Sequence, residues 1–151
     1  RDTDRSRGLG DVYKRQVRDG GGTNHRASLS DMVMLKDNHI AMAGGILPAV
    51  EEVRPHLPIS IQIEVETTTL EEVQEAIDAG ADIIMLDNMD IETMRRAVEL
   101  IDGQAKVEAS GNMTAERLAA VAAVGVDYIS IGALTHSVRA FDISMKIKPI
   151  Q

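Results

Sequence analysis

The sequence predicts an α/β fold built on a parallel sheet, and within that class an incomplete TIM-like (β/α) barrel, truncated at its N-terminal side. Apolar segments rich in β-branched residues alternate with helical patterns at a spacing of about 22 residues, which is typical of βα units. Only five such units and a final strand fit into the 151 residues, whereas a complete barrel needs roughly 200 or more. A doubly wound sheet uses the same units, but no GxGxxG motif follows any strand.

Six segments have the length and composition of buried strands. In chain order they are 32–36, 59–65, 83–86, 106–109, 128–131 and 143–147. The last of them alternates apolar and polar residues, so we expect one of its faces to contact solvent.

Helical patterns separate the strands, at 46–56, 70–77, 91–101 and 114–122. Pro48 suits a first helical turn, where its missing backbone N–H is not needed. Thr69 and Glu72 have the spacing of a capping box, and Asp90 is placed to cap the third helix. Thr114 opens the fourth. Each helix therefore has a predicted start.

Glycines mark where the helical patterns end. Gly80, Gly103 and Gly125 follow them at spacings of 23 and 22 residues, where a left-handed C-cap is needed. The segments AGADIIML (79–86) and VGVDYISI (124–131) also match in pattern, 45 residues apart. This repetition favours a parallel sheet.

Composition excludes several classes of protein. The chain has 16 basic and 24 acidic residues, a formal charge of −8, and only three aromatic residues, which argues against nucleic-acid binding. No apolar run reaches the ~20 residues of a membrane helix, and no signal peptide is visible. The lack of cysteine excludes a disulfide scaffold and a cysteine zinc site; it is compatible with a reducing cytosol, and we expect a cytoplasmic protein.

The first 16 residues differ from the rest. Residues 1–16 carry a net charge of +2 and show neither helical nor strand periodicity, so we expect a disordered or foreign leader. Residues 17–151 then form the C-terminal part of an α/β-barrel catalytic domain.

Polar residues follow the predicted strands in register, at 36–39, 66–67, 87–88, 110–112 and 132–133. The carboxyl ends of parallel strands meet at one edge, so we expect these residues on one rim, where ligand sites of such folds lie. Individually Asp87 suits a helix cap, Lys36 a surface lysine and 110–112 a plain turn. Glu64 and Glu66 are harder to explain, since both point the same way from an apolar strand.

A glycine-rich loop precedes the first strand. Residues 20–22 are glycines whose amides are free to approach an anion, and His25 and Arg26 add donors suited to carboxylate or phosphate. A flexible linker is the alternative. The histidines lack the spacing of a structural zinc site.

Six motifs together resemble the quinolinate phosphoribosyltransferase family, also called nicotinate-nucleotide pyrophosphorylase (carboxylating). They are GGGTNHR (20–26), LKDNHI (35–40), IEVET (63–67), MLDNM (85–89), EASGN (108–112) and IGALTHS (131–137). The resemblance runs from about residue 17 to 147. It implies an enzyme that converts quinolinate and phosphoribosyl pyrophosphate to nicotinate mononucleotide, pyrophosphate and CO2, with Mg2+, in de novo NAD synthesis.

The resemblance also implies roles for residues. His25, Arg26 and Lys36 resemble the ligands of the quinolinate carboxylates. Glu66 and Asp87 resemble the acidic pair near the ribose and Mg2+, and together with Lys36 they form the implied catalytic group. The implied contacts of the 5′-phosphate are Ser110, Gly111, Asn112, Ile131, Gly132 and Ala133, with His136 nearby. Late loops of a barrel are also where phosphate sites are expected on general grounds.

The chain departs from the family in two ways. The family has a smaller α/β domain before the barrel and a Thr-Arg-Lys motif on an early strand, and neither occurs here. We therefore expect a C-terminal fragment that is inactive alone, from a parent that works as a homodimer. The alternatives are a non-catalytic sugar-phosphate-binding barrel fragment, a purely structural fragment, a molybdenum-linked relative, and a nicotinate-specific transferase that does not decarboxylate.

Overall fold

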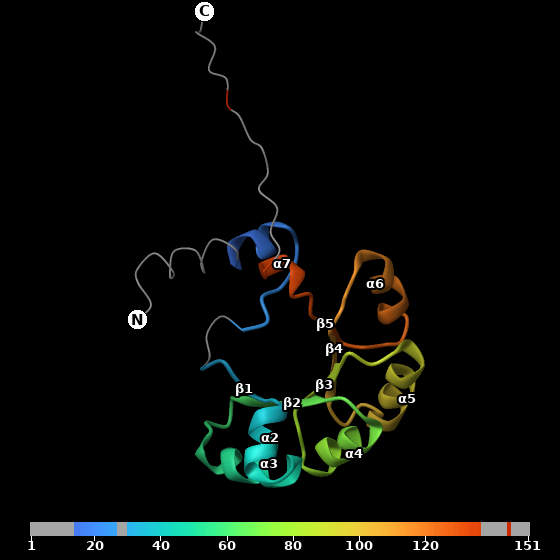
Figure 1. Ribbon diagram of the computed structural model, residues 1–151. Coiled ribbons are helices and arrows are strands. Elements are labelled where there is room, and N and C mark those ends of the chain that lie inside the picture. Colours follow the sequence, from blue (N-terminus) through green and yellow to red (C-terminus); the bar gives the residue numbers. More distant parts are fainter. Residues whose placement is uncertain (1–13, 27–29, 137–144, 146–151) are drawn as a thin grey trace, which may run out of the picture.

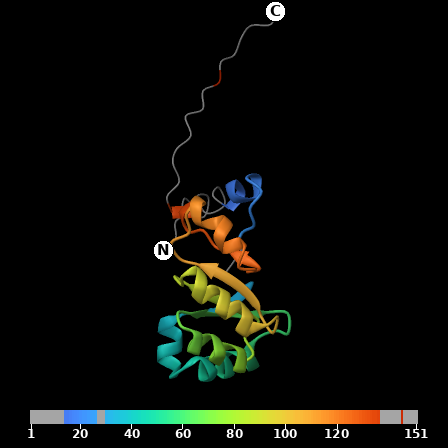
Figure 2. The ribbon, with the colours of Figure 1, turned by 90° about the vertical axis from the view of Figure 1, so that its right-hand side faces the viewer.

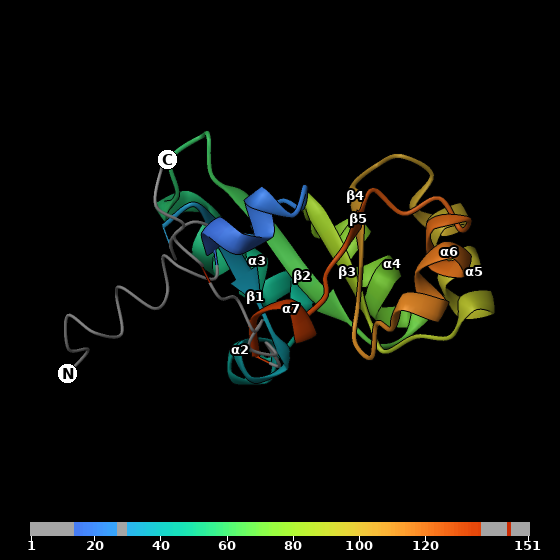
Figure 3. The ribbon, with the colours of Figure 1, turned by 90° about the horizontal axis from the view of Figure 1, so that it is seen from above.

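One parallel sheet organises the molecule. The computed structural model describes residues 14–26, 30–136 and 145. Its strands are β1 (Met32–Leu35), β2 (Gln62–Thr67), β3 (Ile83–Asp87), β4 (Lys106–Ser110) and β5 (Tyr128–Ile129). Each strand pairs in parallel with the one before it, in the order β1-β2-β3-β4-β5, and Figure 3 shows the first three lying side by side.

Most of the helices lie on one side of this sheet. The helices are α2 (Asp37–Ala43), α3 (Ile46–Val53), α4 (Leu70–Asp78), α5 (Ile91–Ile101), α6 (Ala115–Ala122) and α7 (Ala133–His136), with a 3-10 turn η1 (Arg54–His56). Figure 1 shows the sheet as an arc with α2 to α6 on its convex side. A doubly wound sheet would carry helices on both faces and reverse its strand order. The observed order and layering confirm the α/β fold and match an arc of a (β/α) barrel.

The apolar core lies between the sheet and these helices. Successive strand residues point to opposite faces, so one parity of each strand meets the helices. Buried residues of this set include Ile63, Val65, Ile84, Leu86, Val107 and Ala109, and from the helices Val50, Val73, Met94, Ile101 and Val121. The other parity faces the concave side and carries acids: Glu64 and Glu66 on β2 and Glu108 on β4.

Most predicted helix boundaries are confirmed. Thr69 and Glu72 form the capping box of α4, and the Asp90 carboxylate accepts a hydrogen bond of 2.7 Å from the Thr93 N–H at the start of α5. Gly80 and Gly103 adopt positive φ angles of 71° and 73°. Gly125, the third predicted cap, does so at 97°. The sequence therefore contains the signals that start and stop these helices.

Three predicted boundaries are wrong. Residues 37–39, predicted as a loop, form the first turn of α2, a short helix with no fully buried residue and only Ile40 and Ala43 packed against the core. The strand predicted at 59–65 begins at Gln62 instead. A turn, in which the Ile61 N–H donates to the Pro58 carbonyl (2.9 Å), precedes it and leaves Ile59 fully exposed. β5 ends at residue 129 instead of 131. The predicted strand 143–147 lies outside the described residues, apart from Met145.

Residues 14–19 are helical, so the absence of regular structure expected for 1–16 is wrong for 14–16. The backbone N–H groups of Gly20, Gly21 and Gly22 donate to carbonyls of this helix at 2.8–3.0 Å. The helix lies with α7 on the opposite side of the sheet from α3 and α4 (Figures 1 and 2). Among the described residues, no helix has the length and hydrophobicity to cross a membrane.

The two matching segments, 79–86 and 124–131, make the same contact. Asp82, just before β3, donates its N–H to the Ile63 carbonyl (2.9 Å) and accepts the Ile63 N–H on its carboxylate (2.8 Å). Asp127, just before β5, makes the same pair of bonds with Val107, each 2.9 Å long. Each aspartate thus fixes the strand it begins to the start of the preceding strand.

Candidate functional site

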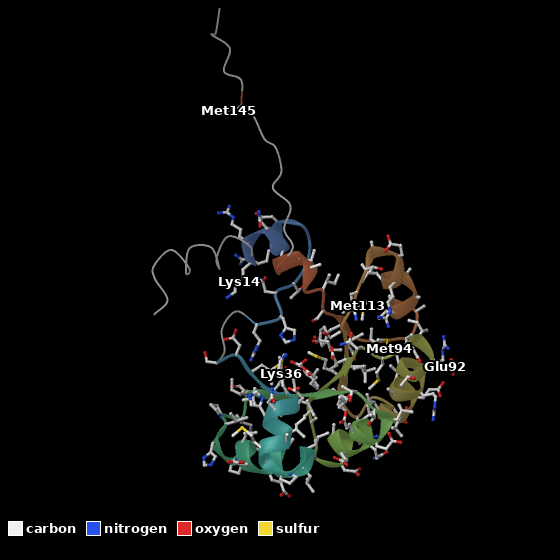
Figure 4. The ribbon with its side chains drawn as sticks, in the orientation of Figure 1. Lys14, Lys36, Glu92, Met94, Met113 and Met145 are labelled. Atoms are coloured by element: carbon white, nitrogen blue, oxygen red, sulfur yellow. The ribbon has the colours of Figure 1, made fainter. Side chains whose placement is uncertain are left out.

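The carboxyl ends of the strands form one edge, as the sequence predicts. Lys36 directly follows β1, and its Nζ lies 3.3 Å from Oε2 of Glu66 near the end of β2. Asp87 and Ser110 end β3 and β4 and are register partners. Figure 4 shows Lys36 on the inner side of the arc, whereas Glu92 lies on the outer surface of α5. The three predicted catalytic residues therefore share this edge.

Asparagine side chains fix Asp87 at this edge. Asn88 Nδ2 donates to Asp87 Oδ2 (2.8 Å), and Asn112 Nδ2 donates to Asn88 Oδ1 (2.9 Å). The Asn88 N–H donates to the Ser110 carbonyl (3.0 Å). Because its second oxygen takes no part in this chain of amides, Asp87 can present that oxygen to a ligand.

Left-handed backbone makes this close approach feasible. Asn88, Gly111 and Asn112 have φ angles of 55°, 84° and 48°. A Cβ at Gly111 would overlap the Asn88 side chain, so only glycine lets the two loops meet. Arg117 of α6 joins the same loops by donating to the carbonyls of Met89 (2.5 Å) and Gly111 (3.4 Å).

A second polar cluster lies on the concave face, below the edge. His25 Nε2 is 3.1 Å from Oε2 of Glu108 and 3.4 Å from Oε2 of Glu64. The glutamate side chains are 5% and 0% exposed and that of His25 is 30% exposed. Ser130 Oγ donates to Oε1 of Glu108 (2.5 Å). Among the described residues, His25, Glu64 and Glu108 are the group whose ligand atoms lie close enough to hold a metal ion.

Burial and charge shift the pKa values of this cluster. The carboxylates of Glu108 and Glu64 beside Nε2 raise the pKa of His25 from 6.5 to about 10, against the opposing effect of burial. Burial raises the pKa of Glu64, while the nearby His25 opposes that shift. The geometry therefore favours a proton on His25.

A cavity of about 730 Å³ opens on the concave side. It is lined by His25, Glu108 and Ser130, and by residues at the starts of strands, such as Met32 and Ile83. Lys36, Glu66 and Asp87 do not line it. The edge therefore carries the three predicted catalytic residues, whereas the cavity is lined by His25 and Glu108 of the second cluster.

The other predicted site residues are dispersed. Arg26 Nη1 donates to the Met32 carbonyl (3.3 Å), so the three predicted carboxylate ligands each contact a different partner. Ile131 and Gly132 line the cavity, and Ala133 begins α7. His136 ends α7, and its side chain lies outside the described part.

Sequence reasoning missed Glu108 and Ser130 as site residues, and it expected Asn88 on the rim without a role of its own. The signal for Glu108 was present, because it is an acid inside an apolar strand, as is Glu64. No signal indicated that His25, which is 83 residues from Glu108, would meet both acids.

Three comparisons with known proteins agree. A family model described as quinolinate phosphoribosyl transferase, C-terminal domain, matches residues 4–146, which includes most of the expected leader. The probable nicotinate-nucleotide pyrophosphorylase [carboxylating] of Bacillus subtilis (strain 168) is 49% identical over 140 residues, covering 93% of this chain and 48% of the relative. The chloroplastic nicotinate-nucleotide pyrophosphorylase [carboxylating] of Arabidopsis thaliana is 49% identical over 158 residues (93% and 45%).

Solved structures give the same result. The crystal structure of NadC from Streptococcus pyogenes superposes with a TM-score of 0.86 at 45% identity, covering 91% of this chain and 48% of that one. The chain thus spans about half the length of the relatives it matches. With the model match over residues 4–146, the chain belongs to the quinolinate phosphoribosyl transferase family and corresponds to its C-terminal domain.

Proposed function

We propose that this chain is the C-terminal part of a phosphoribosyltransferase that converts quinolinate and phosphoribosyl pyrophosphate to nicotinate mononucleotide, pyrophosphate and CO2. The observation that carries the proposal is the shared edge of Lys36, Glu66 and Asp87 in a chain of this family. The names of the relatives describe the same activity.

The acids of the edge suit the first chemical step. When pyrophosphate leaves, positive charge develops on C1 of the ribose, and nearby carboxylates stabilise it. Glu66 and Asp87 are the carboxylates in position, one held by Lys36 and one by Asn88.

Mg2+ fits the same pair of acids. Magnesium is bound in proteins by one or two carboxylates together with substrate phosphates, and Glu66 and Asp87 would hold it in this way. When bound, the ion neutralises charge on the departing pyrophosphate. The residues themselves orient the ribose.

Decarboxylation needs little from the protein. Loss of CO2 from C2 of the pyridine leaves electron density beside a ring nitrogen that has become cationic, so the substrate stabilises its own charge. Lys36, His25 and Arg26 then have the role of orienting the two carboxylates. A dicarboxylate suits three such donors better than nicotinate does.

The backbone of 110–112 and of 131–133 supports a phosphate site. Both segments lie at the ends of late strands, and the left-handed angles at Gly111 and Asn112 turn the backbone of 110–112 at the edge. We assign the 5′-phosphate to these loops, with His136 nearby. Anions are favoured where backbone N–H groups converge.

The rest of the parent protein supplies further cations. Residues 1–16 hold five basic and three acidic residues, so residues 17–151 hold 16 − 5 = 11 basic and 24 − 3 = 21 acidic residues, a net charge of −10. Two polyanionic substrates therefore approach an acidic surface, which is unfavourable at long range. We propose that the longer protein is a homodimer, in which basic residues outside this chain offset the negative charge. The cytoplasmic location stays a prediction.

The test measures pyrophosphate release with quinolinate and Mg2+, for this chain and for a protein extended to the relatives' length. We expect activity from the extended protein and less than a tenth of it from this chain. Lys36→Ala and Glu66→Gln should each reduce kcat/KM at least about tenfold, since a charge-assisted contact contributes roughly 1.5–3 kcal/mol.

The matched control is Glu92→Gln, on the outer surface of α5. An extended protein that binds phosphoribosyl pyrophosphate but releases no pyrophosphate would indicate a sugar-phosphate-binding barrel instead. Release with nicotinate and not with quinolinate would identify a transferase that does not decarboxylate.

A further inference from the structure

Two buried acids near one histidine require an explanation. Glu64 is fully buried, and neither of its carboxylate oxygens has a hydrogen-bond partner within standard geometry. Glu108 is 3% exposed and accepts from Ser130. Burying two carboxylates is costly unless a cation or proton compensates them, and His25 Nε2 is the group that both approach.

We propose that Glu64 and Glu108 are positioning residues, which hold His25 as an imidazolium through Nε2 so that Nδ1–H can donate to a carboxylate of the ligand. This assignment rests on the proposed function, because the ligand is the dicarboxylate of that reaction.

The chemistry of imidazole gives the reason. A neutral ring with its proton on Nε2 has a lone pair on Nδ1, which repels a carboxylate. A second proton turns Nδ1 into a donor and gives the ring a positive charge. Carboxylates at 3.1 and 3.4 Å from Nε2 stabilise that charged form, and the raised pKa of His25 agrees with this geometry.

The two acids also fix where the ring lies. Glu64 belongs to β2 and Glu108 to β4, the strands on either side of β3, so His25 is attached to the rigid sheet although it follows a loop of three glycines. Ser130, directly after β5, donates to Glu108, and Arg26 donates to the carbonyl of Met32. The groups that act on the ring are therefore Glu64 and Glu108, while the adjacent Arg26 acts on Glu64 and the hydroxyl of Ser130 on Glu108.

A divalent cation is the competing occupant. In a tetrahedral zinc site with bonds of about 2.0–2.2 Å, neighbouring ligand atoms lie roughly 3.3–3.6 Å apart, which is close to the distances from Nε2. A metal would displace the proton from Nε2, so the two occupants exclude each other. The test separates them.

The experiment is an NMR titration of the 15N-histidine-labelled 151-residue chain, treated with chelator, in which the side-chain nitrogens report protonation. The chain has four histidines, and His25→Gln assigns the signal. We expect His25 to stay doubly protonated at pH 8. Glu108→Gln and Glu64→Gln should each lower its titration midpoint by at least about one pH unit, whereas Glu92→Gln should leave it unchanged.

A wild-type His25 that is neutral at pH 8 would overturn the proposal, and this measurement needs no glutamate variant to fold. So would one equivalent of Zn2+ that binds His25 at pH 7 and is lost in Glu108→Gln, because the cluster would then be a metal site. In a second experiment on the same labelled chain, quinolinate should shift the Nδ1 signal of His25, and nicotinate should shift it less. Failure of quinolinate to shift it would refute the donor role.

Failure of the proposed function has a different signature. If the extended protein releases no pyrophosphate while His25 stays cationic and responds to quinolinate, the reaction is wrong and the assignment of Glu64 and Glu108 stands. The two readouts are independent because the titration needs no turnover.

Discussion

Single residues decide how the acids of the edge are presented. Asp87 is held by an amide chain through Asn88 and Asn112, and that chain depends on the missing side chain of Gly111. His25 is held in the same way by two acids. In both cases a group expected to meet the ligand is fixed by neighbours that need not touch it.

Gly111→Ala should therefore damage more than local backbone. At φ = 84° an alanine is strained, and its Cβ would displace Asn88 and with it Asp87. The control is Gly103→Ala, where φ is 73° but nothing lies within 4 Å of the added Cβ. We expect urea denaturation to show a loss of about 1 kcal/mol in the control and at least about 1 kcal/mol more in Gly111→Ala. Equal losses would show that the close contact with Asn88 is unimportant.

The charge of His25 also predicts a pH dependence of stability. Its pKa is raised from 6.5 to about 10 on folding, so the folded state binds the proton more tightly. This stabilisation is fully present below pH 6.5 and is lost as the pH rises through 10. We expect the free energy of unfolding to fall between these values, and to fall less in His25→Gln. A difference between the two proteins that is constant with pH would contradict this.

At the scale of elements, the repeated aspartate contact fixes the starts of the strands. Asp82 and Asp127 each accept the N–H of the neighbouring strand, and Asp127 also accepts from Lys106 at 2.7 Å. The contact with Lys106 lowers the pKa of Asp127 and raises that of Lys106. The same device thus serves two βα units.

Removing this acceptor should destabilise the sheet. Asp127→Ala leaves the Val107 N–H without its side-chain partner, and we expect a loss of about 1–2 kcal/mol in urea denaturation. Asp82→Ala should cost a similar amount. Asp78→Ala is the control, because that side chain makes an exposed hydrogen bond to Gln74 within one helix. A cost as small as that of the control would show that the N–H groups find water instead.

Element boundaries were predictable where a local signal exists. Thr69, Asp90 and the glycines that end helices act through groups a few residues away, so their sequence neighbourhood determines them. α2 is seven residues long, has no fully buried residue and no side-chain signal of this kind at its start, so it could not be found in this way. The contacts of His25 with Glu64 and Glu108 join residues 39 and 83 positions apart, so the topology alone brings them together. The edge was predictable because strand register places it.

At the scale of the whole molecule, the described residues form an open arc whose sheet has an outer strand on each side, β1 and β5. Among the described residues β1 pairs only with β2, and β5 only with β4. Unpaired edge strands expose N–H and C=O groups that another chain can bind. The concave face adds an open cavity of about 730 Å³.

We therefore expect the 151-residue chain to self-associate. Light scattering after size-exclusion chromatography should give a mass that rises with concentration, above the 16.4 kDa of one chain. A protein extended to the relatives' length should form one defined species instead. A sharp monomer peak with cooperative unfolding at all concentrations would count against this expectation.

The strictly sequential strand order has a consequence for how the chain acquires its structure during synthesis. The strands begin 30, 21, 23 and 22 residues after one another, and each partner of a new strand has already left the ribosome. At roughly 5–20 residues per second a further unit emerges every few seconds, whereas local structure forms in microseconds to milliseconds. Each βα unit thus has time to dock on its predecessor before the next appears, and nascent chains arrested after β3 should already protect the β2–β3 amides from hydrogen exchange.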